Sequence, residues 1–332
     1  MNEKNYTSQL EKFENVFYII KQVIQKINKE DKGYYEKIVS QANSRIINLS
    51  ISNEKKIPTH CLPKINETHL LDQNLWILKP TGFNRGRGVV VFDSIELLKK
   101  LIKEFSEGTQ EIIINNKQAE DCLSEIDILL NNLGENEDVC VEEPPKEYVK
   151  SNSFIIQKYI EQPLLIDKRK FDVRMWVLID QNYKVYLFKE GYIRTSSMEF
   201  SLDKDSILNK GIHLTNNAVQ KFCNEYGKFE EGNQLSFNQF QKYLEENFPK
   251  EKLNVRENFY TQMKELIKLS IKSLPKKFFA NEKANCFEVF GYDFIIDCKF
   301  KIWLIEVNTN PCLEESSSIL KVLLPRMIST FK

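Results

Sequence analysis

Oxygen-bearing side chains stand at the ends of two apolar segments near the C-terminus, FEVFGYDFIID and KIWLIEVN. A hairpin of these segments that turns at Lys299-Phe300 with two loop residues places Asp293 directly opposite Glu306. Asn308 follows Glu306 by two residues and therefore shares its face on a regular strand. The spacing predicts that two carboxylates and one amide converge.

The same alternation places Ile302 and Leu304 on one face with Glu306 and Asn308. Like charges opposite each other in a sheet are destabilising, so a cation between them is expected. Carboxylate and amide oxygens suit Mg²⁺ that also holds substrate phosphates. We predict that Asp293, Glu306 and Asn308 bind this metal. The alternative is an acidic strand end that faces solvent.

A glycine-rich turn, TGFNRGRG, follows the strand-like segment WILKP and precedes VVVF. Its glycines allow backbone N–H groups to approach an anion, and they lie at positions 82, 86 and 88. The nearby positive charges are Lys79, Arg85 and Arg87. We expect a phosphate to bind here, at Lys79 and along Arg85, Gly86, Arg87 and Gly88. A glycine hairpin with solvated arginines is the alternative.

A third cluster of charges lies in KRKFDVR, where Lys170, Asp172 and Arg174 are spaced for one strand face. Arg194 follows in KEGYIRTSS. Burying Arg174 and Arg194 is costly unless an anion or a carboxylate meets them, which makes them candidates for holding phosphate. Structural ion pairs with Asp172 or Glu190 are the alternative.

Hydrophobic periodicity predicts the elements that position these residues. Strands are expected at WILKP, VVVF, SFIIQKYI, FDVRMWVLID and KVYLFKEGYI, and the last two are joined by residues 181–183. A helix capped by Ser94 covers SIELLKKLIKEF, and further helices are expected near 9–50, 216–226, 236–248, 255–272 and from about 317. This order favours a mixed α+β protein.

Composition narrows the class of protein. Lys+Arg 47 balance Asp+Glu 47, but the segment 119–148 carries a net charge of −9, and the other residues carry +9. A basic body would attract an acidic polymer, whereas a solvated insert with scattered lysines is the alternative. We interpret about 107–150 as a long insert.

Seven cysteines without a CxxC pair indicate a reducing compartment. Neither a signal peptide nor an apolar run of 18 residues is present, so we expect a cytoplasmic protein without a membrane or nucleic-acid partner. Three scattered histidines do not favour a zinc hydrolase.

Nine motifs in order resemble the tubulin–tyrosine ligase family, between about residues 75 and 326: WILKP, RGRG, IIQKYIEQPLLI, RKFDVRMWVLID, KEGYIRTSS, HLTNNAVQK, YGKFEEGNQLSF, FGYDFIID and KIWLIEVNTNP. The resemblance implies an α+β ATP-grasp fold with two lobes that enclose ATP and Mg²⁺. We expect a short helical N-terminal segment at 1–70, a central lobe at 71–165 and a C-terminal lobe at 166–332.

The resemblance also implies residue roles. Lys79 and Lys158 would contact phosphates, and Gln157, Lys158, Tyr159 and Ile160 would line the adenine site. Residues at the nucleotide would be Lys170, Asp172, Thr215 and Asn216. Arg174 and Arg194 would be catalytic, holding the transferred phosphate and the acceptor carboxylate, while Asp293, Glu306 and Asn308 would bind Mg²⁺.

The implied reaction is the ATP-dependent joining of a free amino acid to the acidic C-terminal tail of tubulin through an acyl phosphate. EGYIRTSS, YGKFEEGNQLSFNQF and FGYDFIID are most similar to the tyrosine ligase, whereas HLTNNAVQK is similar to glycylating members. Tyrosine is therefore the expected amino acid, with glycylation or glutamylation as the alternative. A relative that binds microtubules without catalysis is a further alternative. The expected location is the microtubule cytoskeleton, including the cilium or basal body.

Overall fold

The computed structural model describes residues 3–27, 67–69, 73–112, 146–274 and 286–330 of the 332-residue chain. The chain divides into two compact units, one of residues 1–111 with 146–162 and one of residues 112–145 with 163–332. Within the described ranges, every helix is too short or too polar to cross a membrane. Each unit is described by itself.

The first unit is built on an antiparallel sheet in the order β2-β1-β5. Its strands are β1 (Trp76–Pro80), β2 (Val90–Phe92) and β5 (Phe154–Lys158). β1 and β2 form the predicted hairpin, with Leu78 opposite Val90. The glycine-rich segment is the connection between these two strands, so the sequence prediction of strand, turn and strand is confirmed.

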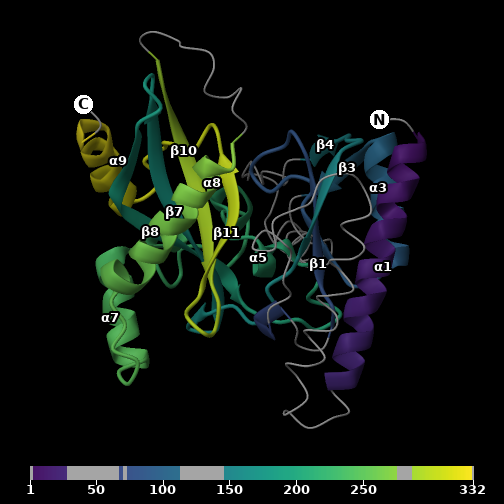
Figure 1. The fold of residues 1–332 in the computed structure, drawn as a ribbon. Coiled ribbons are helices and arrows are strands. Elements are labelled where there is room, and N and C mark those ends of the chain that lie inside the picture. Colours follow the sequence, from purple (N-terminus) through teal and green to yellow (C-terminus); the bar gives the residue numbers. More distant parts are fainter. Residues whose placement is uncertain (1–2, 28–66, 70–72, 113–145, 275–285, 331–332) are drawn as a thin grey trace, which may run out of the picture. The chain divides into compact units, whose positions relative to one another are not determined.

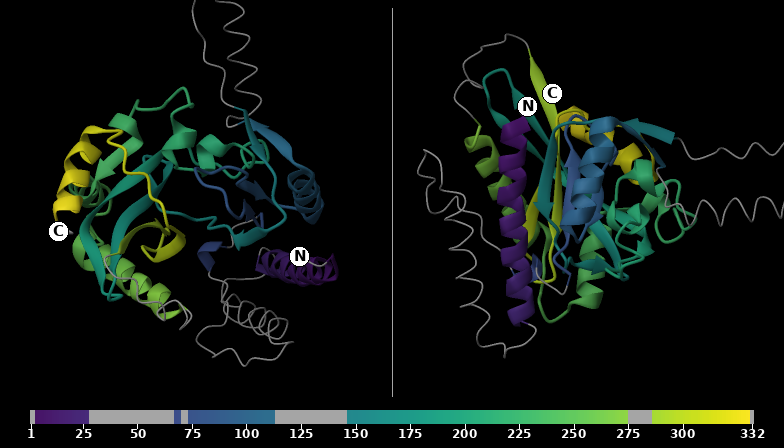
Figure 2. Two further views of the ribbon diagram at one scale, coloured as in Figure 1. Left: turned by 90° about the horizontal axis from the view of Figure 1, so that it is seen from above. Right: turned by 90° about the vertical axis from the view of Figure 1, so that its right-hand side faces the viewer.

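Two helices cover this sheet, α1 (Glu3–Ile27) and α3 (Ile95–Glu107), and they lie side by side (Figures 1 and 2). The predicted cap is confirmed, because the Ser94 side chain accepts a hydrogen bond from the Leu97 backbone N–H at 3.2 Å. Apolar residues recur along one face of each helix and meet the sheet in one core, which includes Phe17, Ile20, Trp76, Leu78, Phe92, Leu98 and Ile102.

The long insert begins and ends in a two-stranded sheet. β3 (Thr109–Ile112) pairs with β4 (Lys146–Val149). Most of the acidic stretch 119–148 lies outside the described residues. The same holds for residues 28–50 of the helical region predicted near 9–50, and for the rest of the predicted 1–70 segment beyond α1 and the short η3 (Glu67–His69). Their predictions stay predictions.

The second unit holds the large antiparallel sheet, in the order β11-β10-β7-β8-β9 with β6 beside β7 (Figure 1). The strands are β6 (Leu165–Ile166), β7 (Arg169–Asp180), β8 (Val185–Glu199), β9 (Gln234–Ser236), β10 (Phe287–Ile296) and β11 (Ile302–Asn308). Residues 181–183 form the predicted loop between β7 and β8, where Tyr183 has a φ of 58°.

The helical elements of this unit follow the predicted pattern with one exception. They are α5 (Lys210–His213), α6 (Asn217–Gln220), η4 (Glu231–Asn233), α7 (Phe237–Asn247), η5 (Val255–Tyr260), α8 (Thr261–Lys272) and α9 (Ser318–Thr330). The helix expected over 216–226 ends at Gln220, and the following residues form turns that end near Gly227, with a φ of 74°. The mixed α+β class with antiparallel sheets is confirmed.

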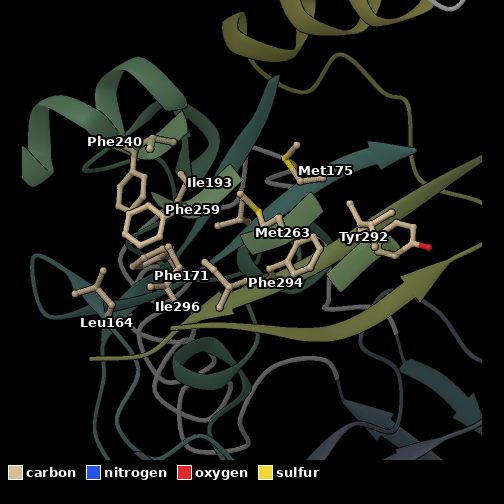
Figure 3. Packing of buried hydrophobic residues seen from close by; sticks show 14 of the residues in the cluster. Leu164, Phe171, Met175, Ile193, Phe240, Phe259, Met263, Tyr292, Phe294 and Ile296 are labelled. Atoms are coloured by element: carbon tan, nitrogen blue, oxygen red, sulfur yellow. The ribbon is translucent and has the colours of Figure 1, made fainter. Parts of the chain in front are cut away.

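One face of the large sheet, here called the core face, packs against α7, η5 and α8 (Figures 1 and 3). Alternate residues of β7 and β10 supply the sheet side of this core. Figure 3 shows Phe171, Phe240 and Phe259 together at one end and Tyr292 beside Phe294 at the other. On the opposite face, α9 packs against a smaller cluster around Trp176, Phe188 and Tyr192.

The β10–β11 hairpin differs from the prediction at its turn. Asp297 and Lys301 close the loop, where the Asp297 N–H donates to the Lys301 carbonyl at 2.9 Å, and three residues lie between them. Phe300 supplies the left-handed backbone, with a φ of 61°. The predicted two-residue turn at Lys299-Phe300 is therefore wrong. Next to the turn, the strand pairing is displaced by one residue from the predicted register.

A β-bulge then restores the predicted pair. Phe294 lies opposite Leu304, whereas Asp293 lies opposite Glu306, so Ile305 is an extra residue on β11. Because Asp293 and Phe294 face opposite sides of the sheet, their partners Glu306 and Leu304 do too. The predicted pairing of Asp293 with Glu306 is confirmed.

The predicted shared face of Ile302, Leu304, Glu306 and Asn308 is wrong. Ile302 and Leu304 belong to the core, while Glu306 and Asn308 lie on the other side of the sheet. The physical reason is the bulge, which shifts side-chain alternation by one residue.

We expect Phe294→Ala to lower the free energy of unfolding by about 3–5 kcal/mol, because a fully buried aromatic ring leaves a cavity when truncated. Urea unfolding followed by fluorescence measures the change. Val307→Ala, on the next strand at an exposed position, is the control and should stay within about 0.5 kcal/mol of the unchanged chain. Equal midpoints for the two variants would contradict the core assignment.

Candidate functional site

The face of the large sheet opposite the core face carries buried charges and is here called the charged face. Residues of β7 (Lys170, Asp172, Arg174) alternate with the core residues Phe171 and Val173. Their neighbours on the adjacent strands are Arg194 of β8 and Asp293 of β10, which pair with Asp172 and Arg174 respectively. The structure therefore brings together residues from segments more than a hundred positions apart.

Arg194 and Asp172 form a two-point ion pair. Arg194 Nε donates to Asp172 Oδ1 at 2.7 Å, and Nη2 donates to Oδ2 at 2.6 Å. The Thr215 hydroxyl donates to the same Oδ2 at 2.6 Å. All three residues are less than 10% exposed, so the pair is shielded from water and strengthened by the low dielectric.

Asp293 is held by two arginines. Arg174 binds it through Nε and through Nη2, the latter at 2.9 Å from Oδ2, and Arg194 Nη2 lies 2.9 Å from the same Oδ2. Burial alone would raise the pKa of Asp293, but Arg194 and Arg174 hold it well below its usual range. Burial alone would lower the pKa of Arg194, but Asp172 and Asp293 raise it. Both groups stay charged.

The sequence left open whether Arg174 and Arg194 hold phosphate or form structural ion pairs, and these contacts answer part of that question. Carboxylates meet Arg174 and Arg194, as the ion-pair alternative required, and Asp172 is one of them. Glu190 instead pairs with Arg326 near the surface. Among the described residues, the hydrogen bonds of both arginines leave Nη1 unused, so each guanidinium keeps a donor for another anion.

Glu306 and Asn308 complete the charged face from β11. Asn308 Nδ2 lies 3.2 Å from Asp293 Oδ2 and 3.2 Å from Glu306 Oε1, so all three predicted metal ligands converge. Within the described ranges, no three His, Cys, Asp or Glu side chains gather as a metal centre, and this set holds only two carboxylates. The oxygen donors fit Mg²⁺, provided that the Asn308 amide turns its oxygen toward the carboxylates.

Lys170 and Asn216 lie at the margin of this constellation. The buried Lys170 ammonium donates to the His213 carbonyl at 2.8 Å. Asn216 precedes α6 at its N-cap position without a capping bond from its side chain, and it follows Thr215. The His213 ring is buried, and its Nε2 lies 3.0 Å from the Ser206 carbonyl. His213 therefore serves the packing of this segment.

The glycine-rich hairpin of the first unit has the backbone that its sequence predicts. Gly82, Gly86 and Gly88 all have positive φ, and Arg85 shares this conformation with a φ of 60°. Position 88 also has no room for a side chain, because a Cβ there would lie 2.4 Å from Pro80 Cγ. Arg87 donates to Asn84 Oδ1 at 3.2 Å and lies over the Phe83 ring. Arg85 is exposed, and Lys79 is partly buried on β1.

Lys158 ends β5, next to Gln157 and ahead of the buried Tyr159 and Ile160. Its ammonium donates to Glu161 Oε1 at 2.5 Å and to the Leu75 carbonyl at 2.8 Å. Burial lowers its pKa to about 8, although Glu161 opposes that shift. An ammonium has three donors, so a phosphate contact by Lys158 has to compete with these bonds.

Sequence reasoning missed three residues that support the charged face and Lys158. Glu161 is buried and holds both Lys158 and the Leu75 N–H. Gly291 leaves room for Pro311 and Arg174, since a Cβ there would lie 2.9 Å from Pro311 Cβ and 3.3 Å from the Arg174 guanidinium carbon. Gln220 is fully buried within HLTNNAVQK. All three lie inside recognised motifs, which was the available signal.

The sequence model of the tubulin-tyrosine ligase family matches residues 1–331. The chain is 30% identical over 263 residues to tubulin glycylase 3B of Tetrahymena thermophila, covering 77% of this chain and 18% of that protein. It is 31% identical over 245 residues to the probable tubulin polyglutamylase TTLL9 of Bos taurus, covering 73% and 49%.

A third match is the protein monoglycylase TTLL8 of Homo sapiens, 30% identical over 291 residues, covering 81% of this chain and 28% of that protein. The chain thus spans half or less of the length of these three relatives.

We expect Asp172→Asn to lower the free energy of unfolding by about 3 kcal/mol, because it removes the charge that compensates buried Arg194. Glu190→Gln is the matched control, since it breaks an ion pair with Arg326 that is partly exposed to solvent and should cost less than about 1 kcal/mol. Urea unfolding of both variants at pH 7 provides the comparison. A smaller loss for Asp172→Asn than for Glu190→Gln would contradict the buried pair.

Stability should fall as the pH drops below about 6.5, through His213. Burial first, then nearby Lys170, lowers the pKa of His213 to about 3 in the folded chain, although the bond to Ser206 opposes the shift. The unfolded chain therefore binds more protons between these values, and His213 destabilises the fold by about 2 kcal/mol at pH 5. Urea titrations of the unchanged chain and His213→Gln at pH 7 and pH 5 measure this. The variant should lose about that much less stability between the two pH values, and parallel losses would refute the assignment.

Proposed function

Because the chain belongs to the tubulin-tyrosine ligase family, we propose that it is an ATP-dependent ligase that joins an amino acid to a carboxylate of an acidic protein tail, with tubulin as the substrate. The observation that carries this proposal is the charged face of the second unit. Two arginines meet there beside a convergent set of carboxylate and amide groups.

Arg174 and Arg194 suit the role of holding anionic substrate groups. Each is fixed by a two-point bond to a buried carboxylate, so its guanidinium is oriented before a ligand arrives. Pre-oriented donors stabilise developing negative charge without reorganisation. We assign these arginines to the transferred phosphate and to the acceptor carboxylate, through the donors that their ion pairs leave unused.

Asp293, Glu306 and Asn308 are the proposed ligands for Mg²⁺, and the fit rests on their oxygen chemistry and convergence. When bound, the ion would neutralise nucleotide phosphate charge. Asp293 would then share its negative charge between the ion and the two arginines, which requires it to stay ionised. The strongly lowered pKa of Asp293, which Arg194 and Arg174 enforce against its burial, meets that requirement.

We propose an ATP-grasp fold for the chain, and we propose nucleotide-binding residues in each unit taken by itself. In the first unit these are Lys79, the hairpin 85–88 and residues 157–160, where the hairpin has the positive-φ backbone suited to an anion. In the second unit they are Lys170, Asp172, Thr215 and Asn216. Lys170 and Thr215 are already held in place by side-chain hydrogen bonds, to the His213 carbonyl and to Asp172 respectively.

The amino acid is the finer question. The motifs EGYIRTSS and FGYDFIID favour tyrosine, whereas two of the three relatives named above are glycylases and one is named as a polyglutamylase. We propose tyrosine as the first candidate, and glycine and glutamate as the second because the relatives' names support them. An acidic tail would be attracted to the net positive charge that the residues outside 119–148 carry. We place the protein at the microtubule cytoskeleton, including the cilium.

We expect this chain, with ATP and Mg²⁺, to incorporate one of tyrosine, glycine or glutamate into tubulin, and Glu306→Gln to reduce the rate at least about 100-fold by weakening the proposed metal site. Mass spectrometry of the tubulin tails identifies the amino acid added.

Glu288→Gln, an exposed acid on β10, is the matched control and should keep the unchanged rate. Binding of tubulin without incorporation of any of the three amino acids would favour a non-catalytic relative. An unimpaired Glu306→Gln variant would reject the metal assignment alone.

A further inference from the structure

Gln220, the last residue of α6, is a buried amide that the proposed chemistry does not use. Its side chain is fully buried and makes three hydrogen bonds to the main chain of other segments. Gln220 Oε1 accepts from the Ser197 N–H at 2.6 Å. Its Nε2 donates to the Gly211 carbonyl at 3.0 Å and also to the Leu214 carbonyl. Every donor and acceptor direction of this amide except one lone pair is therefore in use.

The three bonds join two segments that contribute to or contact the charged face, β8 with Arg194 and the segment 211–215 with Thr215. Ser197 lies on β8, three residues after Arg194. Leu214 directly precedes Thr215, whose hydroxyl is bonded to Asp172. Asp172 in turn holds Arg194 at two points. These contacts form a closed ring within one unit. The ring runs from Gln220 through Thr215, Asp172 and Arg194 to Ser197, which is bonded to Gln220.

Side chains hold three carbonyl groups of the segment 211–215. Gln220 binds the carbonyls of Gly211 and Leu214, and Lys170 binds the carbonyl of His213 between them. Carbonyl oxygens are acceptors only, so side chains that hold them must be donors. The remaining contact, with the Ser197 N–H, needs an acceptor. An amide is the side-chain group of this length that meets both demands at once.

We propose that Gln220 is a positioning residue that holds Thr215 against Asp172 and thereby fixes the orientation of Arg194. It touches no reacting group itself. The effect on catalysis rests on the function proposed above, whereas the effect on segment 211–215 does not. Removing the amide leaves a buried N–H and two carbonyls without their partner, which is costly at a buried site.

Two replacements of similar size separate the hydrogen bonds from the packing. Gln220→Met removes all three bonds, and Gln220→Glu keeps the acceptor but turns a second oxygen toward two carbonyls. Gln262 offers a matched control, because its amide also accepts from one backbone N–H, of Ile302, and donates to two carbonyls, of Asn258 and Phe300. Gln262 serves the turn of the β10–β11 hairpin instead of the segment 211–215.

Hydrogen exchange followed by mass spectrometry tests the structural half. We expect Gln220→Met to speed exchange at least about tenfold in peptides covering 195–199 and 211–216, with peptides of α7 and α8 unchanged, because only the first two segments lose a partner. Gln262→Met should instead speed exchange near 300–302. Uniform acceleration throughout the second unit in Gln220→Met would overturn the proposal, as would fast exchange of 211–216 in the unchanged chain.

Steady-state kinetics test the functional half. We expect both Gln220 variants to lower kcat about 10- to 100-fold with KM for tubulin changed less than about twofold, since a misplaced Arg194 weakens the transition state more than substrate binding. Gln262→Met should keep the unchanged kcat. Unchanged kcat in Gln220→Met, or an equal loss in Gln262→Met, would overturn the positioning role.

The outcomes also separate this inference from the proposed function. If the unchanged chain ligates none of the three amino acids, the proposed function fails, and the exchange experiment still decides whether Gln220 holds the segment. If Gln220→Met does not fold, the kcat of Gln220→Glu tests the positioning role in its place. Fast exchange of 211–216 in the unchanged chain still overturns the proposal.

Discussion

The charged face depends on one arrangement, two buried arginines that share carboxylates across three neighbouring strands. Arg194 binds Asp172 and Asp293, and Arg174 binds Asp293, so each of these four charges has a partner. Removing a single member would leave an uncompensated charge in a site that is nearly closed to water. The sheet tolerates this row because its other face supplies a large apolar core. Stability is thus provided by one side of the sheet, and the other side carries the groups suited to chemistry.

Several irregular features of the fold serve that row. The extra residue Ile305 shifts Glu306 and Asn308 from the core face to the charged face without moving Asp293 out of register. Gly291 lacks a side chain where Pro311 and Arg174 both need space, and its backbone is not in the left-handed region, so room is the reason for the glycine. The Gln220 amide closes the contacts around Thr215. A β11 strand without the bulge, a larger side chain at Gly291 or an apolar one at Gln220 would present a different surface.

The comparisons with known proteins show the family, and the charged face contains the side chains that are suited to the proposed reaction. Two of the relatives are named as enzymes that modify tubulin, with different amino acids. Under the function proposed above, the shared part of the machinery handles the carboxylate and the phosphate. Two arginines fixed by carboxylates are suited to that shared task, whatever amine is joined. We expect the features that select the amine to lie elsewhere.

The sequence alone predicted the strands β1, β2, β5, β7, β8, β10 and β11, the capped helix α3, the glycine hairpin and the residues of the charged face, because these follow from local periodicity and from motifs. It did not predict the short strands β3, β4, β6 and β9. It also placed Asp293 opposite Glu306, although through a wrong turn that the bulge at Ile305 compensates. Only the tertiary structure decided which carboxylate each arginine binds, since those bonds join Arg174 with Asp293 across 119 positions. Local patterns carry no information on such distant pairs. For the same reason the commitment of Lys158 to Glu161 and the three bonds of Gln220 emerged from packing, where burial obliges each polar group to find a partner.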